Sequence, residues 1–79
     1  MNEKLIQIIS KVMKVPTDEI NDDSGPENME NWTSFNSYVL LYELEKEFEQ
    51  KFTMDEAMDV KNVGDIKRHL KNHGVVLDD

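Results

Sequence analysis

The stretch WTSFNSYVLLYELEKEF, residues 32–48, decides the fold of this 79-residue chain. Its apolar residues recur at the spacing of one helix face, namely Leu40 or Leu41, Leu44 and Phe48. Thr33 and Ser34 stand where a polar loop ends, and the side-chain oxygen of either can accept an otherwise unpaired backbone N–H of the first turn. The stretch therefore predicts a helix over about residues 34–50 that begins at a hydroxyl residue.

The remainder of the chain predicts three more helices. A first helix over about residues 2–14 has a full apolar stripe, made of Leu5, Ile8, Ile9, Val12 and Met13. A short helix over 54–60 follows Thr53, and a last helix over 63–73 ends before Gly74. No window alternates with the period of a strand. We therefore predict an all-α fold in one domain over residues 1–79, a small antiparallel four-helix bundle of three longer helices and one short one, with a frayed tail over 75–79.

The connection between the first two helices is long and acidic. Residues 15–33 carry six carboxylates and neither lysine nor arginine. Apolar residues interrupt the acidic run, so we expect an ordered loop rather than a disordered tail. An EF-hand calcium site does not fit, because Gly25 at the turn position would put Ile20 where the first carboxylate ligand belongs. A loop of this length in a compact bundle usually serves a function.

The composition disfavours several classes of protein. A formal charge of −8 argues against a nucleic-acid binder, which needs clustered cations, and against attachment to anionic lipid. No apolar run approaches the roughly 20 residues of a membrane span, and the N-terminus does not resemble a signal peptide. The absence of cysteine excludes disulfides, thiolate metal sites and a cysteine nucleophile. We expect a cytoplasmic monomer without nucleic-acid or membrane partners, and the small size disfavours a self-contained enzyme.

His69 and His73 stand four residues apart, which places both imidazoles on one face of the last helix. Lysine and arginine side chains flank them, and these cations would repel a metal ion. We expect solvated histidines near the end of a helix rather than ligands, and hence no metal site.

Ser34 is the hydroxyl residue best placed for chemistry. Unpaired N–H groups and the helix dipole favour negative charge at a helix start, so a phosphodiester on Ser34 would be stabilised there. The alternative is an ordinary capping serine, and Ser37 is the nearby competitor one turn later. Neither a neighbouring histidine nor a G-x-S-x-G motif supports catalysis by Ser34, and we expect no catalytic residue.

Two further sets of side chains are candidates for a surface that docks a partner protein. Phe35, Tyr38 and Tyr42 share a face beside the leucines of the predicted helix. We expect Phe35 in the core and leave Tyr38 and Tyr42 open between the core and a docking face. Glu43 and Glu47 are like charges four residues apart, a pattern typical of a solvated or partner-facing surface.

Four segments of the chain have the order and spacing of a known family. Trp32-Thr33-Ser34-Phe35, followed by Leu44-Glu45-Lys46-Glu47-Phe48, is similar to an Asp-Ser-Leu motif and a Leu-Glu-x-x-Phe motif at the same interval. Val15–Ile20 with Asp23-Ser24, and Phe52 to Ile66, are similar to the flanking loop and later helices. Over about residues 3–73 the chain resembles the acyl carrier proteins and the related peptidyl carrier domains.

The resemblance implies that Ser34 carries a covalent 4′-phosphopantetheine arm, installed from coenzyme A by a phosphopantetheinyl transferase. The chain would hold an acyl or aminoacyl cargo on this arm as a thioester and would catalyse nothing itself. Its partners would be acyl or aminoacyl ligases and synthases with basic docking patches. The residues expected to recognise these partners are Thr33, Phe35, Tyr38, Val39, Tyr42, Glu43, Glu45 and Glu47.

Two positions depart from the family pattern. Thr33 replaces the usual aspartate, which removes a carboxylate that would contact a basic group on the transferase. Phe35 replaces the usual leucine and enlarges the apolar surface beside the arm. We therefore predict a specialised, freestanding carrier rather than the housekeeping fatty-acid carrier. The alternative is a carrier-like interaction or regulatory protein that has lost the attachment function and is never modified.

Overall fold

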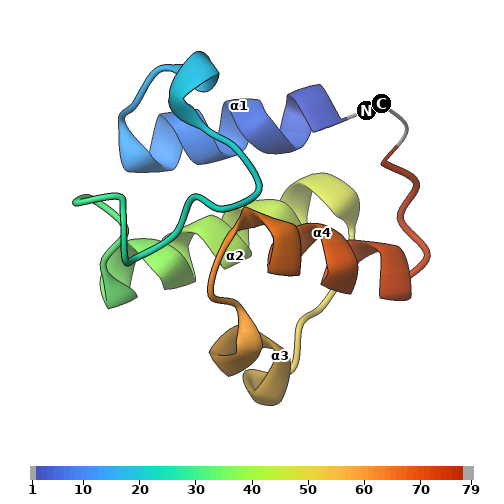
Figure 1. Ribbon diagram of the computed structural model, residues 1–79. Coiled ribbons are helices and arrows are strands. Elements are labelled where there is room, and N and C mark those ends of the chain that lie inside the picture. Colours follow the sequence, from blue (N-terminus) through green and yellow to red (C-terminus); the bar gives the residue numbers. More distant parts are fainter. Residues whose placement is uncertain (1, 78–79) are drawn as a thin grey trace.

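The computed structural model describes residues 2–77, and its regular elements are all helices (Figure 1). They are α1 (Asn2–Met13), the 3₁₀ helix η1 (Thr17–Glu19), α2 (Ser34–Phe48), α3 (Met54–Asp59) and α4 (Val63–Asn72). Residues 2–77 contain no strand, and none of their helices is long and apolar enough to cross a membrane. The prediction of a small all-α bundle with three longer helices and one short helix is confirmed.

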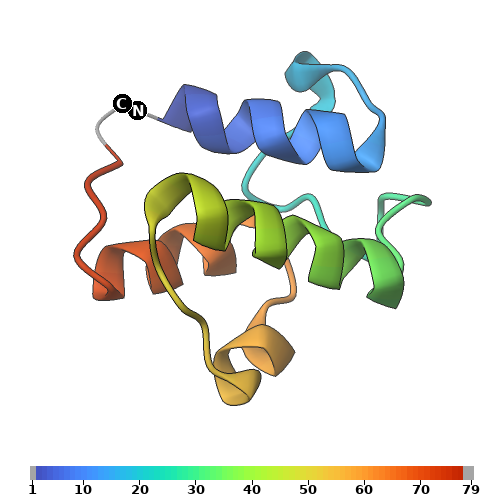
Figure 2. The same cartoon turned by 180° about the vertical axis from the view of Figure 1, so that it is seen from behind.

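The helices are arranged so that α2 and α4 lie between α1 on one side and the short α3 on the other (Figures 1 and 2). The long loop after α1 brings the chain back, so α2 runs opposite to α1. The chain reverses through α3, and α4 then runs in the same general direction as α2. This path leaves the start of α2 at one end of the molecule, next to the end of the long loop.

One core joins the three longer helices. Its fully buried side chains are Leu5, Ile9 and Met13 from α1, Leu40 and Leu44 from α2, and Val63, Ile66 and Leu70 from α4. Trp32, from the long loop, is also buried in this cluster. Phe48 is only partly buried against this core, whereas Leu44 of the same helix is fully buried in it. The helical spacing of the leucines thus identified the buried face of α2.

The long loop is ordered and is attached to the start of α4. The Ser24 carbonyl accepts a hydrogen bond from the Val63 N–H at 2.9 Å, and the Asp22 carbonyl accepts one from the Gly64 N–H at 2.9 Å. Gly25 is required at this contact, because a Cβ there would lie 2.3 Å from the Lys61 carbonyl oxygen. The expectation of an ordered loop is therefore met.

The helix ends differ from the predicted ones by one or two residues. α1 stops at Met13 because Lys14 adopts a left-handed backbone with φ of 60°, and α2 stops at Phe48 because Glu49 does so with φ of 55°. Lysine and glutamate rarely adopt this backbone conformation, so the side chains at these two positions do not mark the stops. Gly74, with φ of 89°, ends the last helix as expected.

The predicted frayed tail is wrong for the part that the structure describes. Val75 packs partly against the core, and Leu77 is 8% exposed. The two apolar side chains gain enough from burial to hold the segment against the bundle. Residues 78–79 of the predicted tail lie outside the described residues.

Candidate functional site at the start of α2

At the start of α2, the residue that caps the helix is not the residue whose hydroxyl we expect to be modified. Thr33 is the N-cap, and its Oγ1 accepts a hydrogen bond from the Asn36 N–H at 3.1 Å. The Asn36 side chain donates to the Asn31 carbonyl at 2.7 Å and so joins the helix to the loop. Ser34 is the first residue of the helix proper, and it is exposed. Of the two capping residues left open by the sequence, the structure selects Thr33.

Ser34 borders a hollow of about 230 Å³ between the loop, the first turns of α2 and α3. The lining residues are Pro26, Trp32, Thr33, Ser34, Ser37, Tyr38, Ala57 and Val60. The indole Nε1–H of Trp32 is buried and has no hydrogen-bond partner among the described residues. The N-terminus of a 15-residue helix favours an anion, and the hydroxyl groups beside it can donate to amide oxygens. These residues fit a phosphodiester-linked arm.

A second hollow, of about 190 Å³, continues from the first between α2 and α3. Tyr38 and Ala57 line both hollows. The other residues of the second hollow are Leu41, Tyr42, Glu45, Phe52, Thr53 and Met54. Its surface is largely apolar, so the exposed serine opens onto a mixed polar hollow and then onto an apolar one.

Three of the four aromatic side chains of α2 are exposed to solvent. Phe35 is 75% exposed, Tyr38 56% and Tyr42 58%. The expectation that Phe35 lies in the core is wrong, because the buried face of α2 carries Leu40, Leu41 and Leu44, and Phe35 lies on another face. For Tyr38 and Tyr42 the structure favours the surface over the core. Val39, on the neighbouring face, is half-buried.

Each glutamate of α2 lies beside a cation or a backbone N–H of this chain. Glu45 Oε2 accepts a hydrogen bond from the Phe52 N–H at 2.7 Å and so fixes the entry to α3. Glu47 pairs with Lys4 of α1 at 2.9 Å, and Glu43 lies 4.0 Å from Lys46. Each of these carboxylates, predicted to face partners, therefore has a cation or an N–H of this chain beside it.

The two histidines are not solvated, which corrects the prediction made from their position near a helix end. His69 is 7% exposed, and its Nε2 lies 2.9 Å from Asp59 Oδ2. His73 is half-buried, with Nε2 2.7 Å from Glu56 Oε2. The reason is that α3 packs against α4 and brings both carboxylates to the face that carries the imidazoles. Among residues 2–77 no group of three potential ligands is arranged to hold a metal ion.

Glu56 and Asp59 are residues that the sequence reasoning missed. A hydrogen bond from the Thr53 N–H, and then one from His73, lowers the pKa of Glu56 below its ordinary value. Contact with Arg68, and then with His69, lowers the pKa of Asp59 in the same way. A signal was present, because carboxylates three residues apart on one helix can face histidines four residues apart on the next.

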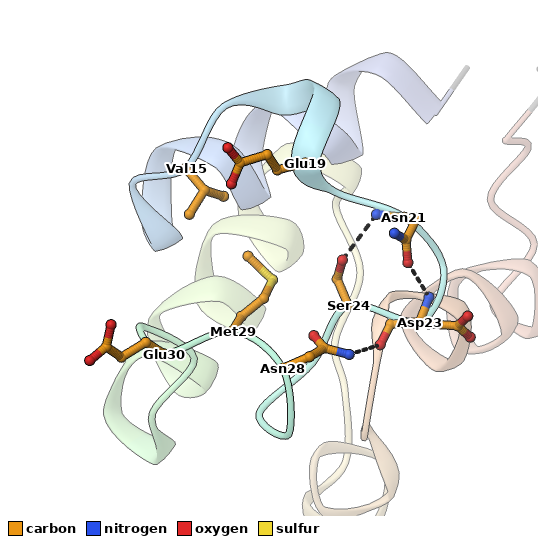
Figure 3. Close-up of a pocket in the computed structure, with 8 residues that line it drawn as sticks. All are labelled: Val15, Glu19, Asn21, Asp23, Ser24, Asn28, Met29 and Glu30. Carbon is orange, nitrogen blue, oxygen red and sulfur yellow. Dashed lines mark hydrogen bonds between the residues drawn. The ribbon is translucent and has the colours of Figure 1, made fainter.

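The acidic loop has a hollow of its own, of about 480 Å³, that shares no lining residue with the one beside Ser34. Figure 3 shows that its polar groups serve to fold the loop. Ser24 Oγ accepts from the Asn21 N–H at 3.0 Å, and the Asn28 side chain donates to the Asp23 carbonyl at 2.8 Å. These bonds account for the order of the loop, and the candidate site remains at the start of α2.

Known proteins share the segments that build this site. Residues 3–70 match the protein family described as a phosphopantetheine attachment site. The acyl carrier protein of Borreliella burgdorferi (strain ZS7) is 37% identical over 68 residues, which cover 86% of this chain and 85% of that protein. The acyl carrier protein of Borrelia garinii subsp. bavariensis matches with the same identity and coverage. This chain belongs to the acyl carrier protein family.

The carrier thus bears a covalent 4′-phosphopantetheine arm, and the alternative of an unmodified, carrier-like protein is not favoured. When attached, the arm supplies a terminal thiol that holds the cargo as a thioester. Membership of the family also implies that the carrier works with a phosphopantetheinyl transferase and with biosynthetic enzymes. The exposed hydroxyl at the start of α2 and the two adjoining hollows are the features of the fold that suit this role.

Proposed function

We propose that Ser34 is the residue to which the arm of this carrier is attached. The observation that carries the proposal is that Ser34 is exposed at the first position of α2 while Thr33 makes the cap. The Ser34 hydroxyl can therefore be esterified without loss of the hydrogen bond that starts the helix. Ser37 is half-buried one turn later and is less accessible to another protein.

The attachment forms one bond and breaks one. Ser34 Oγ bonds to the phosphorus of coenzyme A that carries pantetheine, and the pyrophosphate linkage of coenzyme A breaks. Adenosine 3′,5′-bisphosphate leaves with the bonding electrons, and the hydroxyl proton passes to a base of the transferase. The first turn of α2 then faces the new phosphodiester with its N–H groups, and no acidic residue of that turn competes with it.

We further propose that the carrier catalyses no step itself and acts as a cytoplasmic monomer formed by one domain over residues 1–79. Its partners are the transferase and acyl or aminoacyl ligases or synthases, which act on the thioester. A net charge of −8 attracts partners with basic patches and raises the rate of encounter. The residues around Ser34 that we assign to partner contact are Thr33, Phe35, Tyr38, Val39, Tyr42, Glu43, Glu45 and Glu47.

The replacements of Thr33 and Phe35 at the arm support a specialised carrier. Thr33 offers a transferase no carboxylate, and Phe35 presents a large exposed ring immediately after the attachment residue. We propose that this carrier serves synthase or ligase partners of its own. If enzymes of general fatty-acid elongation loaded and extended cargo on it as efficiently as on their own carrier, the proposal of specialisation would be wrong.

Intact-protein mass spectrometry tests the attachment residue. The purified apo-protein is incubated with coenzyme A, magnesium and a broad-specificity phosphopantetheinyl transferase. We expect one added phosphopantetheine on the unaltered chain and on Ser37→Ala, and none on Ser34→Ala. Modification of Ser34→Ala, or loss of modification in Ser37→Ala with Ser34 intact, would overturn the assignment. Circular dichroism of each variant checks that the helices are retained.

A further inference from the structure

We infer that two histidines and two carboxylates form a pH-sensitive contact between α3 and α4. This histidine–carboxylate contact holds α3 against α4 while the imidazoles are protonated, and it releases α3 when they lose their protons. It consists of Glu56 and Asp59 from α3 and His69 and His73 from α4. The effect on an attached arm rests on the proposed function at Ser34, whereas the movement of α3 does not.

Each imidazole of the contact has an oxygen beside both of its nitrogens. His69 Nε2 lies 2.9 Å from Asp59 Oδ2, and its Nδ1 lies 3.8 Å from Glu56 Oε2. His73 Nε2 lies 2.7 Å from the same Glu56 oxygen, and its Nδ1 lies 3.2 Å from Gln50 Oε1. The Gln50 amide nitrogen donates to a backbone carbonyl two residues earlier, so its oxygen faces the ring. Because an imidazole has two N–H donors only when it is protonated, this arrangement suits the charged rings.

Loss of the proton leaves one nitrogen of each ring with a lone pair. That lone pair then faces a carboxylate or amide oxygen, which is also an acceptor. Hydrogen bonds lower the pKa of Glu56 and of Asp59, so both carboxylates are charged at neutral pH. His69 is buried, so water cannot readily satisfy a nitrogen that has lost its partner. Deprotonation therefore weakens the histidine–carboxylate contact.

The surrounding groups leave the histidines as the part of the contact that changes near neutral pH. Arg68 of α4 lies 2.7 Å from Asp59 and 3.3 Å from Asp65, and its guanidinium stays charged. Within residues 2–77, no other charged side chain pairs with either imidazole. The ring of Phe52, from the connection before α3, packs edge-on against His73 at 5.3 Å. Histidine changes its charge between about pH 5 and 8.

Release of α3 would open the hollows beside Ser34. Ala57 of α3 lines both hollows, and Val60 at the end of α3 lines the one beside Ser34. Trp32 lines that hollow with them, is buried, and is the single tryptophan of the chain. Movement of α3 away from α4 therefore widens the hollow and exposes the indole. An arm attached at Ser34 would lie in a wider and wetter space at higher pH.

Hydrogen exchange of the apo-protein measures the release of α3, once rates are corrected for the intrinsic effect of pH on exchange. Each proton lost on opening makes opening up to about tenfold more favourable per pH unit. We expect the protection of the α3 amides to fall by about tenfold between about pH 6 and 8, where histidine titrates. The amides of α1 should remain protected, because local opening leaves the core packed. Quenching of Trp32 fluorescence by acrylamide should increase over the same range.

The double variant His69→Gln/His73→Gln keeps a side-chain donor at both positions but cannot gain a charge. Its α3 should exchange at about pH 6 as fast as that of the unaltered chain at about pH 8. Lys71→Gln removes an exposed cation from the same helix, and this matched control should keep the full response. Circular dichroism checks the helices. If the double variant unfolds, His69→Gln alone should keep only part of the response.

Three results would overturn the inference. They are equal protection of α3 at both pH values in the unaltered chain, a full response in a histidine variant, and loss of protection in all helices together. Because the apo-protein carries no arm, these results do not bear on the attachment at Ser34. Failure of the mass-spectrometric test at Ser34 would in turn leave the histidine–carboxylate contact unaffected.

Discussion

At the scale of single residues, Thr33 and Ser34 divide two tasks that neighbouring polar residues often share. Thr33 supplies the oxygen that starts α2, and Ser34 leaves its hydroxyl accessible. Because threonine is neutral and the first turn of α2 holds no acidic residue, the positive end of the helix dipole is not compensated locally. The phosphodiester of the arm would supply that compensation.

Replacement of the cap should therefore destabilise the carrier. Thr33→Val keeps the size of the side chain but removes the oxygen that bonds the Asn36 N–H. We expect a loss of about 1 kcal/mol in the free energy of unfolding, the usual value of such a cap. Thr33→Asp should retain the stability, because aspartate also accepts this bond. Urea unfolding measures all three chains, and equal stability of Thr33→Val and Thr33→Asp would contradict the role of Thr33.

Attachment of the arm should stabilise the fold. The phosphodiester brings negative charge to the first turn of α2, and such a charge contributes about 0.3–1 kcal/mol at low ionic strength. We expect the modified carrier to unfold at higher urea than the unmodified one. The gain should be smaller in Thr33→Asp, where a carboxylate already faces the helix start. A modified carrier that is less stable than the unmodified one would show that the arm does not lie at this helix terminus.

Residues whose roles depend on near neighbours could be predicted from the sequence. The hydroxyl at the start of α2 and the glycine after α4 are examples, because caps and stops depend on a few adjacent positions. The burial of His69 against Asp59 was not predicted, since Asp59 lies ten residues away on another helix, and the matching spacings do not by themselves show that the two helices pack together. The prediction for Phe35 was wrong for a similar reason. The spacing of apolar residues shows which faces of α2 are apolar, but it does not show which of these faces the rest of the chain covers.

At the scale of elements, α3 is the helix that depends most on polar contacts. It has six residues, and none of them is buried. A capping box between Thr53 and Glu56 starts it, and Glu56 and Asp59 join it to the histidines and Arg68 of α4. α3 also forms a wall of both hollows beside the arm. The position of that wall thus depends on contacts that pH can change.

Acid should loosen α3. The pKa values of Glu56 and Asp59 are lowered in the folded carrier, so both carboxylates stabilise it fully above their ordinary values of 4.5 and 3.8. This contribution is lost as the pH falls through the lowered values. Asp59→Asn should therefore lower the melting temperature at pH 7 and do so less at about pH 3. Asp55→Asn, at an exposed position of the same helix, is the control. An equal effect of Asp59→Asn at both pH values would contradict the prediction.

The existence and order of the four helices were predictable because each has an apolar stripe, a cap or a stop within its own residues. The contacts that join them were harder to predict. The attachment of the long loop to α4 uses the backbone of Asp22 and Ser24, and a backbone carbonyl leaves no trace in a pattern of side chains. From the sequence, Gly25 was considered only as the turn residue of a calcium loop that does not fit, whereas the structure shows that it permits this close approach.

At the scale of the whole molecule, negative charge opposes compactness. The chain has 17 acidic against 9 basic residues, and the loop over residues 15–33 holds six carboxylates without a cation. Surface ion pairs such as Lys4 with Glu47 offset little of the repulsion among these carboxylates, because exposed pairs contribute about 0–1 kcal/mol. The same charge that attracts basic partners therefore costs stability.

Added salt should consequently stabilise the carrier. Screening weakens the long-range repulsion among the excess carboxylates more than it weakens the few close pairs, so the melting temperature should rise between about 0.02 and 0.5 M NaCl. A relief of about 1 kcal/mol would raise it by about 4–8 °C in a domain of this size. The double variant Glu27→Gln/Glu30→Gln, which neutralises two exposed positions of the acidic loop, should start from a higher melting temperature and gain less from salt. A melting temperature that falls with salt would show instead that the close ion pairs dominate the electrostatics of the bundle.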